Sequence, residues 1–356
     1  MFRIIVGDVM AGLAQLESES VQTVVTSPPY WGLRDYGIAG QLGLEASPAE
    51  YVDRMMTVFD QVRRVLRLDG TPWLNLGDCY ASAGGAGWQG KNGQRADRRF
   101  VASRENVPRL ASRNAIEGLK PKDLVGMPWR VAFALQAAGW WLRSDIVWSK
   151  PNPMPESITD RPTRSHEYLF LMSRSRRYRY DADAIREPFS ESSLERQALA
   201  DGRVADEDPA RYKTGQGRAS GRPPTVDGQV MMPRRKTAAD PHAGGRRQAP
   251  EPGEPGAFHP LGRNRRSVWT IATQPFSGAH FATFPVALVE PCILAGSRPG
   301  DTVLDPFAGA GTTLLVADRL GRNGIGIELN PAYAALATRR IADEAPLFHP
   351  EHREGS

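Results

Sequence analysis

The chain has 356 residues, of which 40% are hydrophobic and 24% charged, so it can bury a core as one large or two modest domains. Its net charge of +5 permits a polyanionic partner, and its only cysteines, Cys79 and Cys292, exclude a disulfide framework and indicate a reducing compartment. No apolar run approaches the roughly 20 residues of a membrane helix, and the chain opens directly on a predicted strand. We therefore expect a cytoplasmic protein without signal peptide or membrane contact.

The first 80 residues alternate between apolar runs typical of buried strands and amphipathic helical patterns. In chain order the patterns predict a strand at Phe2–Val6, a helix at Ala11–Leu16, a strand at Val21–Val25, a helix at about Pro48–Leu66, a turn at Asp69-Gly70 and a strand at Thr71–Leu76. The long helix carries its large apolar side chains on one face, namely Tyr51, Met55, Val58, Phe59, Val62 and Leu66. This alternation predicts an α/β fold.

The pentapeptide Thr26-Ser27-Pro28-Pro29-Tyr30 directly follows the third of these elements. Its two prolines end the strand, because neither donates to a ladder and each fixes φ near about −65°. The result is a rigid extended turn at the carboxyl end of a strand, where open α/β sheets place their chemistry. The turn presents a hydroxyl, carbonyl oxygens and an aromatic ring, which suit a flat heterocycle with an exocyclic amino group.

Two segments have a different composition. Residues 81–122 are glycine-rich at first and carry nine Lys or Arg against three acids, which predicts a long mobile basic loop. Residues 190–266 hold ten glycines and nine prolines, with 14 basic residues against 10 acids, and cannot bury enough apolar surface to fold alone. Between them the patterns predict a helix at Val125–Ala138 and strands at Trp141–Trp148 and Tyr168–Met172.

A glycine-rich loop lies near the end of the chain. A short strand, Thr302–Asp305, leads through Pro306-Phe307-Ala308-Gly309-Ala310-Gly311-Thr312-Thr313 into a helix at Leu314–Leu320 and a strand at Gly324–Glu328. This is the half-Rossmann arrangement for a nucleoside-bearing cofactor, in which the glycines let the backbone approach the ligand. Glu328 is placed to accept hydrogen bonds from two ribose hydroxyls.

Together the tetrapeptide Ser27-Pro28-Pro29-Tyr30 and the Asp-Pro-Phe-x-Gly-x-Gly loop resemble the motifs of amino-group DNA methyltransferases. These enzymes transfer methyl from S-adenosylmethionine to N4 of cytosine or N6 of adenine. The serine form is similar to the cytosine-N4 branch, whereas aspartate or asparagine is the usual adenine-N6 form. The order, with the catalytic motif first, resembles the permuted beta class. The resemblance covers most of residues 1–190 and 267–342.

Further segments resemble the same family in the same order. Ile4–Asp8 is similar to the strand whose acid meets the cofactor's adenine, and His280–Pro285 to the segment that closes over the methionine moiety. Ile146–Pro151 and His166–Met172 resemble the strand pair beyond the catalytic loop. The resemblance implies a Rossmann-like methyltransferase fold: a mostly parallel sheet with helices on both faces, a circularly permuted motif order and long irregular insertions.

The resemblance also implies site residues and partners. It implies Ser27, Pro28, Pro29 and Tyr30 as catalytic residues, and Asp8, Phe281, Asp305, Phe307, Gly309, Gly311, Thr312, Glu328 and Asn330 as residues that bind S-adenosylmethionine. The implied partner is double-stranded DNA, with a separately acting restriction endonuclease as a second candidate; the oligomeric state stays open. No Cys-x-x-Cys or His-Glu-x-x-His spacing indicates a metal site.

The implied domain map follows the motifs. The catalytic half comprises 1–80 and 123–189, divided by the basic loop 81–122. A variable target-recognition region at 190–266 precedes the cofactor-binding half at 267–342 and a flexible tail at 343–356.

Four alternatives stay open at this point. The first is adenine-N6 transfer on the same fold, the second a catalytically inactive DNA-binding relative, and the third an RNA or protein methyltransferase. The fourth is carbon-5 methylation, because Pro291-Cys292 and Glu105-Asn106-Val107 resemble motifs of those enzymes. Their order along the chain is wrong for that family, and Cys292 lies in an apolar helical run where cysteine is usually a buried hydrophobe.

Overall fold

The structure, a computed structural model, describes residues 1–33, 35–81, 118–194, 225–226, 229–230, 259–274 and 285–344. The chain divides into two units, one made of residues 1–185 and 266–356 and the other of residues 186–265. Most of the predicted basic loop and target-recognition region, together with His280 and Phe281, lies outside the described residues.

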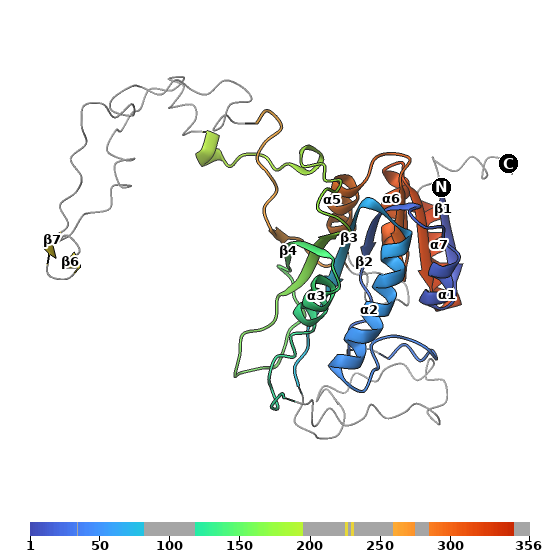
Figure 1. Ribbon diagram of the computed structural model, residues 1–356, viewed down its shortest axis with the longest axis horizontal. Helices are drawn as coiled ribbons and strands as arrows, with labels where there is room; N and C mark the ends of the chain where they lie inside the picture. Colours follow the sequence, from blue (N-terminus) through green and yellow to red (C-terminus); the bar gives the residue numbers. More distant parts are fainter. Residues whose placement is uncertain are drawn as a thin grey trace. The chain divides into compact units, whose positions relative to one another are not determined.

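An eight-stranded sheet is the framework of the larger unit (Figure 1). Its order is β1-β10-β9-β2-β3-β5-β4-β8. The strands are β1 Phe2–Val6, β2 Val21–Thr26, β3 Leu66–Leu76, β4 Trp141–Ser149, β5 His166–Ser173, β8 Val268–Thr270, β9 Thr302–Asp305 and β10 Asn323–Glu328. Neighbours pair in parallel except at β5, which is antiparallel to both β3 and β4.

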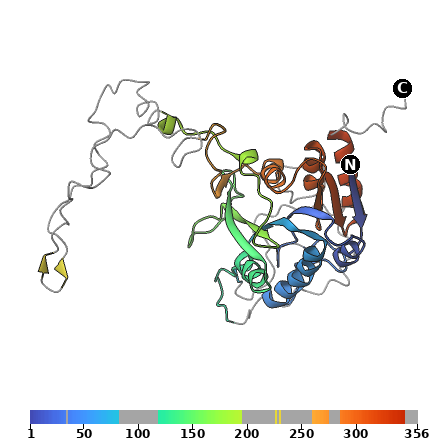
Figure 2. The ribbon, with the colours of Figure 1, turned by 45° about the horizontal axis from the view of Figure 1, so that its top comes forward.

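Helices cover both faces of this sheet (Figures 1 and 2). One face carries α1 Val9–Ala14, α2 Pro48–Val65 and α3 Met127–Ala137, and the other carries α5 Val286–Gly296, α6 Thr312–Arg319 and α7 Pro331–Glu344. The sheet with its two helical layers confirms the predicted Rossmann-like fold.

The middle of the sheet joins the two halves of the sequence. Strand β9, from the C-terminal part of the chain, pairs in parallel with β2, so that Val24 lies opposite Leu304. Both strands therefore end at the same edge of the sheet, each running directly into its motif. The permuted order predicted from the sequence thus still brings the two motifs together in space.

The packing of the long helix follows the predicted pattern. The six apolar residues of its expected face are at most 2% exposed. Helix α5, whose residues are apolar apart from the exposed Glu290, lies in the opposite layer and buries Cys292 completely. The Cys292 thiol lies 3.2 Å from the Leu288 carbonyl oxygen, as expected for a small hydrophobe inside a helix.

Two local predictions were wrong in detail. Asp69-Gly70 is not a turn, because β3 continues from Leu66 to Leu76 with an irregularity: Val21 pairs with Leu66, whereas Thr23 pairs with Thr71. The extra residues are accommodated as a bulge rather than a chain reversal. The first helix begins at Val9 rather than Ala11, because the Asp8 carboxylate caps it through the amides of Met10 and Ala11 at 2.9 and 3.2 Å.

Two β pairings occur among the described residues of the smaller unit. Strands β6 Thr225–Val226 and β7 Gln229–Val230 form a two-stranded antiparallel pair. Glu187 and Arg263 exchange backbone hydrogen bonds of 2.9 and 2.8 Å and form an ion pair at 3.4 Å. Among the described residues of the whole chain, no helix is long and apolar enough to cross a membrane.

Candidate functional site

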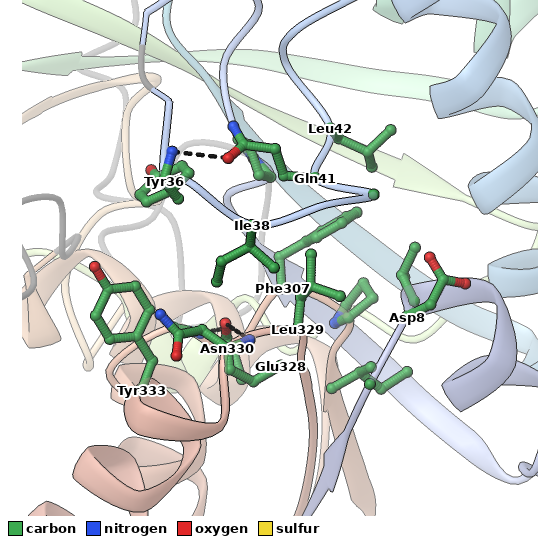
Figure 3. Close-up of a pocket in the computed structure, with 18 of the residues that line it drawn as sticks. Asp8, Tyr36, Ile38, Gln41, Leu42, Phe307, Glu328, Leu329, Asn330 and Tyr333 are labelled. Carbon is green, nitrogen blue, oxygen red and sulfur yellow. Dashed lines mark hydrogen bonds between the residues drawn. The ribbon is translucent and has the colours of Figure 1, made fainter. Parts of the chain in front are cut away.

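A cavity lies at the carboxyl edge of the sheet, where β1, β10, β9 and β2 end (Figure 3). Each strand contributes residues at its carboxyl end or just beyond it. The lining consists of Gly7, Asp8 and Val9; Ser27 and Pro29; Pro306, Phe307, Ala308, Gly309, Ala310 and Thr312; Ile327, Glu328, Leu329, Asn330 and Tyr333; and Tyr36, Ile38, Gly40, Gln41 and Leu42. The two sequence motifs therefore open into one cavity.

Glu328 organises the floor of this cavity. Its Oε2 accepts a hydrogen bond from the Gly309 amide at 2.8 Å, and its Oε1 accepts one from the Asn330 amide at 2.8 Å. Burial raises the pKa of this carboxyl, while the two backbone donors act in the opposite direction. Each oxygen keeps a further lone pair, so the carboxylate can still accept from a ligand hydroxyl.

Asp305 and Gly311 are not among the lining residues, although the sequence resemblance implied cofactor contact for both. Asp305 is 1% exposed and accepts from the Thr26 hydroxyl at 2.7 Å, the Thr313 hydroxyl at 2.8 Å and the Phe307 amide at 3.0 Å. Gly311 has φ +76°, and a Cβ there would lie 2.8 Å from Ala337 Cβ. Both residues stabilise the glycine-rich loop through contacts with the protein interior.

Ser27 lines the cavity, and its hydroxyl lies at one end of a hydrogen-bond network. Ser27 Oγ lies 3.1 Å from Tyr30 Oη and 3.3 Å from Asn75 Oδ1. Tyr30 Oη in turn lies 2.9 Å from Asn75 Oδ1 and 2.7 Å from Glu167 Oε2. Burial, and next the charge of Glu167, raise the pKa of Tyr30 well above its usual value, so the phenol stays protonated.

The other three residues of the tetrapeptide differ in their contacts. The Pro29 carbonyl accepts the Tyr51 hydroxyl at 2.9 Å, whereas the Pro28 carbonyl receives no hydrogen bond from the part of the chain that the structure describes. Pro28 and Tyr30 do not line the cavity itself. The Tyr30 ring lies against Gly77, where a Cβ would approach the ring carbon Cε2 to 2.6 Å.

The sequence did not identify one wall of the cavity. Tyr36, Ile38, Gln41 and Leu42 come from the loop that follows the tetrapeptide, and the Gln41 side-chain oxygen accepts the Tyr36 amide at 2.7 Å (Figure 3). No periodicity or motif marks this loop, so no signal in a single sequence distinguishes it from an ordinary connection. Tyr333, on α7, was not identified either, because no motif marks its position.

Fold and cavity define an α/β protein with a nucleoside-type site at the carboxyl edge of its sheet. A family model of the N6/N4 methyltransferases, described as DNA methylase, matches residues 21–339. The type II methyltransferase M.Cfr9I of Citrobacter freundii is 43% identical over 95% of this chain and 87% of its own length. M.SmaI of Serratia marcescens is 42% identical over 95% of this chain and 90% of its own. The chain therefore belongs to the DNA methylase family of amino-group methyltransferases.

Two solved structures share the fold. The putative DNA modification methylase TTHA0409 of Thermus thermophilus, complexed with S-adenosyl-L-methionine, matches with a TM-score of 0.53 and 24% identity over 98% of this chain and 96% of its own. The cytosine-N4-specific PvuII DNA methyltransferase matches with a TM-score of 0.54 and 17% identity over 96% of this chain and 90% of its own.

The buried carboxyl of Asp305 predicts a pH-dependent stability. Burial raises its pKa from the usual 3.8 to about 6, so the folded state penalises ionisation and loses stability as the pH rises from about 4 to about 6. Asp305→Asn removes this ionisation. The free energy of unfolding of the variant minus that of the wild type should therefore increase over this range by on the order of 3 kcal/mol and level off above it. Chemical denaturation between pH 4 and 8 measures this; a difference independent of pH would contradict it.

The close approach of Gly77 to Tyr30 predicts a steric effect. Gly77→Ala must displace the aromatic ring, because its Cβ would lie 2.6 Å from a ring carbon. We expect methyl transfer to fall by about tenfold or more, equivalent to about 1.4 kcal/mol. Cofactor affinity should stay within about twofold, because Gly77 does not line the cavity. Calorimetry and a radiolabel transfer assay separate the two effects, and an equal loss of both would rule this geometry out.

Proposed function

We propose that this protein is a type II DNA methyltransferase that methylates N4 of cytosine in double-stranded DNA, using S-adenosylmethionine. The observation that carries the proposal is the position of Ser27. This residue lines the same cavity as the glycine loop and Glu328, at the start of a Ser-Pro-Pro-Tyr sequence. The type II methyltransferases with 42–43% identity support the class, and the serine supports the cytosine-N4 branch.

The cavity suits S-adenosylmethionine, which supplies an electrophilic methyl group on a sulfonium. Glu328 is held so that its carboxylate can accept from ribose hydroxyls, and Phe307 offers apolar surface to a purine. Asp8, two residues after the end of β1, is a second acidic residue of the lining. Thr312 and Asn330, also implied by the resemblance, complete the set that we assign to this ligand.

Groups of the protein itself bind the target base and orient its amino group. A base amino group is a poor nucleophile, because its lone pair is delocalised into the ring, and it must be flipped out of the duplex to be reached. We assign the Ser27 hydroxyl and the Pro28 carbonyl as acceptors of the two amino hydrogens. Accepting both aims the nitrogen lone pair and stabilises the positive charge that grows on nitrogen during attack. The Tyr30 ring is assigned as the surface against which the base stacks.

The DNA contacts are proposed from sequence position and charge. We assign the basic segment 81–122 to the phosphate backbone and residues 190–266 to target recognition, because the latter separate the catalytic and cofactor halves. Phosphate contacts by Lys and Arg would make DNA affinity fall steeply with salt. We also propose a cytoplasmic role beside a separately acting restriction endonuclease, which the type II names of the relatives support.

Adenine-N6 transfer is the second candidate function, because the family includes both amino groups. Incubating the protein with unmethylated DNA and S-adenosylmethionine, then digesting the DNA to nucleosides, decides between the two. We expect N4-methyldeoxycytidine as the only new deoxynucleoside. N6-methyldeoxyadenosine would replace the cytosine assignment, and no methylated nucleoside from any DNA would favour an inactive DNA-binding relative.

Glu328 provides a test of the cofactor assignment. Glu328→Ala removes the acceptor assigned to the ribose and releases the amides of Gly309 and Asn330. Because a hydrogen bond to a charged group contributes about 1.5–3 kcal/mol, affinity for S-adenosylmethionine should fall by about tenfold or more. Calorimetric titration measures it, with Glu290→Ala on the exposed side of α5 as the matched control. Unchanged affinity in Glu328→Ala would place the cofactor elsewhere.

Cys292 tests the carbon-5 alternative. Direct transfer to an amino group needs no thiolate, and the Cys292 thiol is fully buried within α5. Cys292→Ser should therefore keep most of the methyl-transfer rate, with a loss of stability of about 1 kcal/mol from burying a hydroxyl. Loss of transfer in a variant that stays folded, or 5-methylcytosine as product, would revive the carbon-5 reaction.

A further inference from the structure

Behind Ser27 lies a charged pair that the transfer reaction as described does not use. Glu167, on β5, accepts from the Tyr30 hydroxyl at 2.7 Å and forms an ion pair with Lys150, just after β4. Both charged side chains are largely buried, at 16% and 17% exposed. The Lys150 ammonium also lies 4.3 Å from the centre of the Trp148 ring, which fixes it further.

The direction of β5 explains how Glu167 reaches this place. Because β5 is antiparallel to both neighbours, its first residues lie beside the last residues of β3 and β4, with Glu167 opposite Trp148 and Tyr168 opposite Leu76. A parallel strand would place its beginning at the opposite edge of the sheet. The antiparallel strand therefore delivers a carboxylate to the edge where the tetrapeptide lies.

The geometry assigns a direction to each proton of the network. The Asn75 amide nitrogen donates to the Tyr168 carbonyl at 3.1 Å, which turns the amide oxygen toward Tyr30 and Ser27. The single proton of Tyr30 has two acceptors and goes to the carboxylate of Glu167, the shorter and charge-assisted contact. Tyr30 Oη is then an acceptor toward Ser27.

A serine hydroxyl can donate or accept, so its use as an acceptor must be fixed by its neighbours. Here both groups within reach of the Ser27 proton, Tyr30 Oη and Asn75 Oδ1, are acceptors. We propose that Glu167, anchored by Lys150, is a positioning residue that acts through Tyr30 to hold Ser27 as an acceptor for the target amino group. This inference rests on the proposed function.

Removal of the carboxylate tests the proposal by chemical rescue. In Glu167→Ala the Tyr30 proton loses its charged acceptor, and the single-turnover transfer rate should fall by about tenfold or more, with cofactor affinity within about twofold of wild type. The variant leaves a gap beside the unpaired Lys150, which attracts a small carboxylate. Sodium formate should restore at least part of the rate, whereas sodium chloride at equal ionic strength should not.

Two variants show whether the effect passes through Tyr30. Tyr30→Phe removes only the hydroxyl group and should lower the transfer rate about as much as Glu167→Ala. Formate should not restore the transfer rate of the double variant that carries both Tyr30→Phe and Glu167→Ala. Glu156→Ala is the matched control: this acid lies in the connection that leads from β4 to β5 and pairs with Arg161 at 2.8 Å. It should transfer methyl at the wild-type rate.

The proposal is overturned if Glu167→Ala keeps its transfer rate, if chloride rescues as well as formate, or if formate restores the double variant. It is also overturned if Tyr30→Phe is fully active. An experiment without DNA or cofactor tests the role of Glu167 independently of the proposed function. In NMR spectra of protein labelled at tyrosine Cζ, the chemical shift of Tyr30 should change in Glu167→Ala and should not change in Glu156→Ala. A changed shift with no methyl transfer by the wild type would instead reject the proposed function alone.

Discussion

The site depends on one buried contact between the two ends of the sequence. Asp305, the last residue of β9, accepts from the Thr26 hydroxyl at the end of β2, 279 residues away, at 2.7 Å. Its other oxygen accepts from Thr313 at the start of α6, and the Thr313 hydroxyl also lies 3.1 Å from the Val25 carbonyl. Because Asp305 is wholly buried, all these bonds are made inside the protein, and losing one would leave a polar group unsatisfied. The contact therefore sets where Ser27 lies relative to the glycine loop.

Backbone groups form the structure on one side of this contact, whereas side chains form it on the other side. On the side that we assign to the cofactor, the loop geometry comes from main-chain donors held by Glu328 and from the close packing of Gly311 against α7. On the side that we assign to the base, side chains that follow β2 or lie on β3 and β5 converge in one network. The first arrangement needs only a short local sequence, whereas the second needs the sheet to be assembled.

This difference explains what the sequence predicted. The strand–loop–helix–strand unit around Glu328 is local, so Thr302–Asp305 was placed at its true bounds, and the periodicity of α2 identified its buried face. The buried contact of Asp305 with Thr26 was not predicted, because a motif does not show that its acid reaches a threonine far away in the sequence. The loop at Tyr36–Leu42 and the pairing of Glu167 with Tyr30 arise from contacts between strands far apart in sequence, which local patterns do not encode.

The mixed sheet also limits how the chain can be varied. An acid in the first position of the tetrapeptide is an acceptor by its own chemistry, whereas the proton of a serine there must be directed by its neighbours. In this chain the neighbours are Asn75 on β3 and Tyr30, backed by Glu167 on the one antiparallel strand among the described strands of the sheet. Under the role that we propose for Glu167, the serine form requires more of the fold than the tetrapeptide itself, and the start of β5 belongs to the site together with the loop that follows β2.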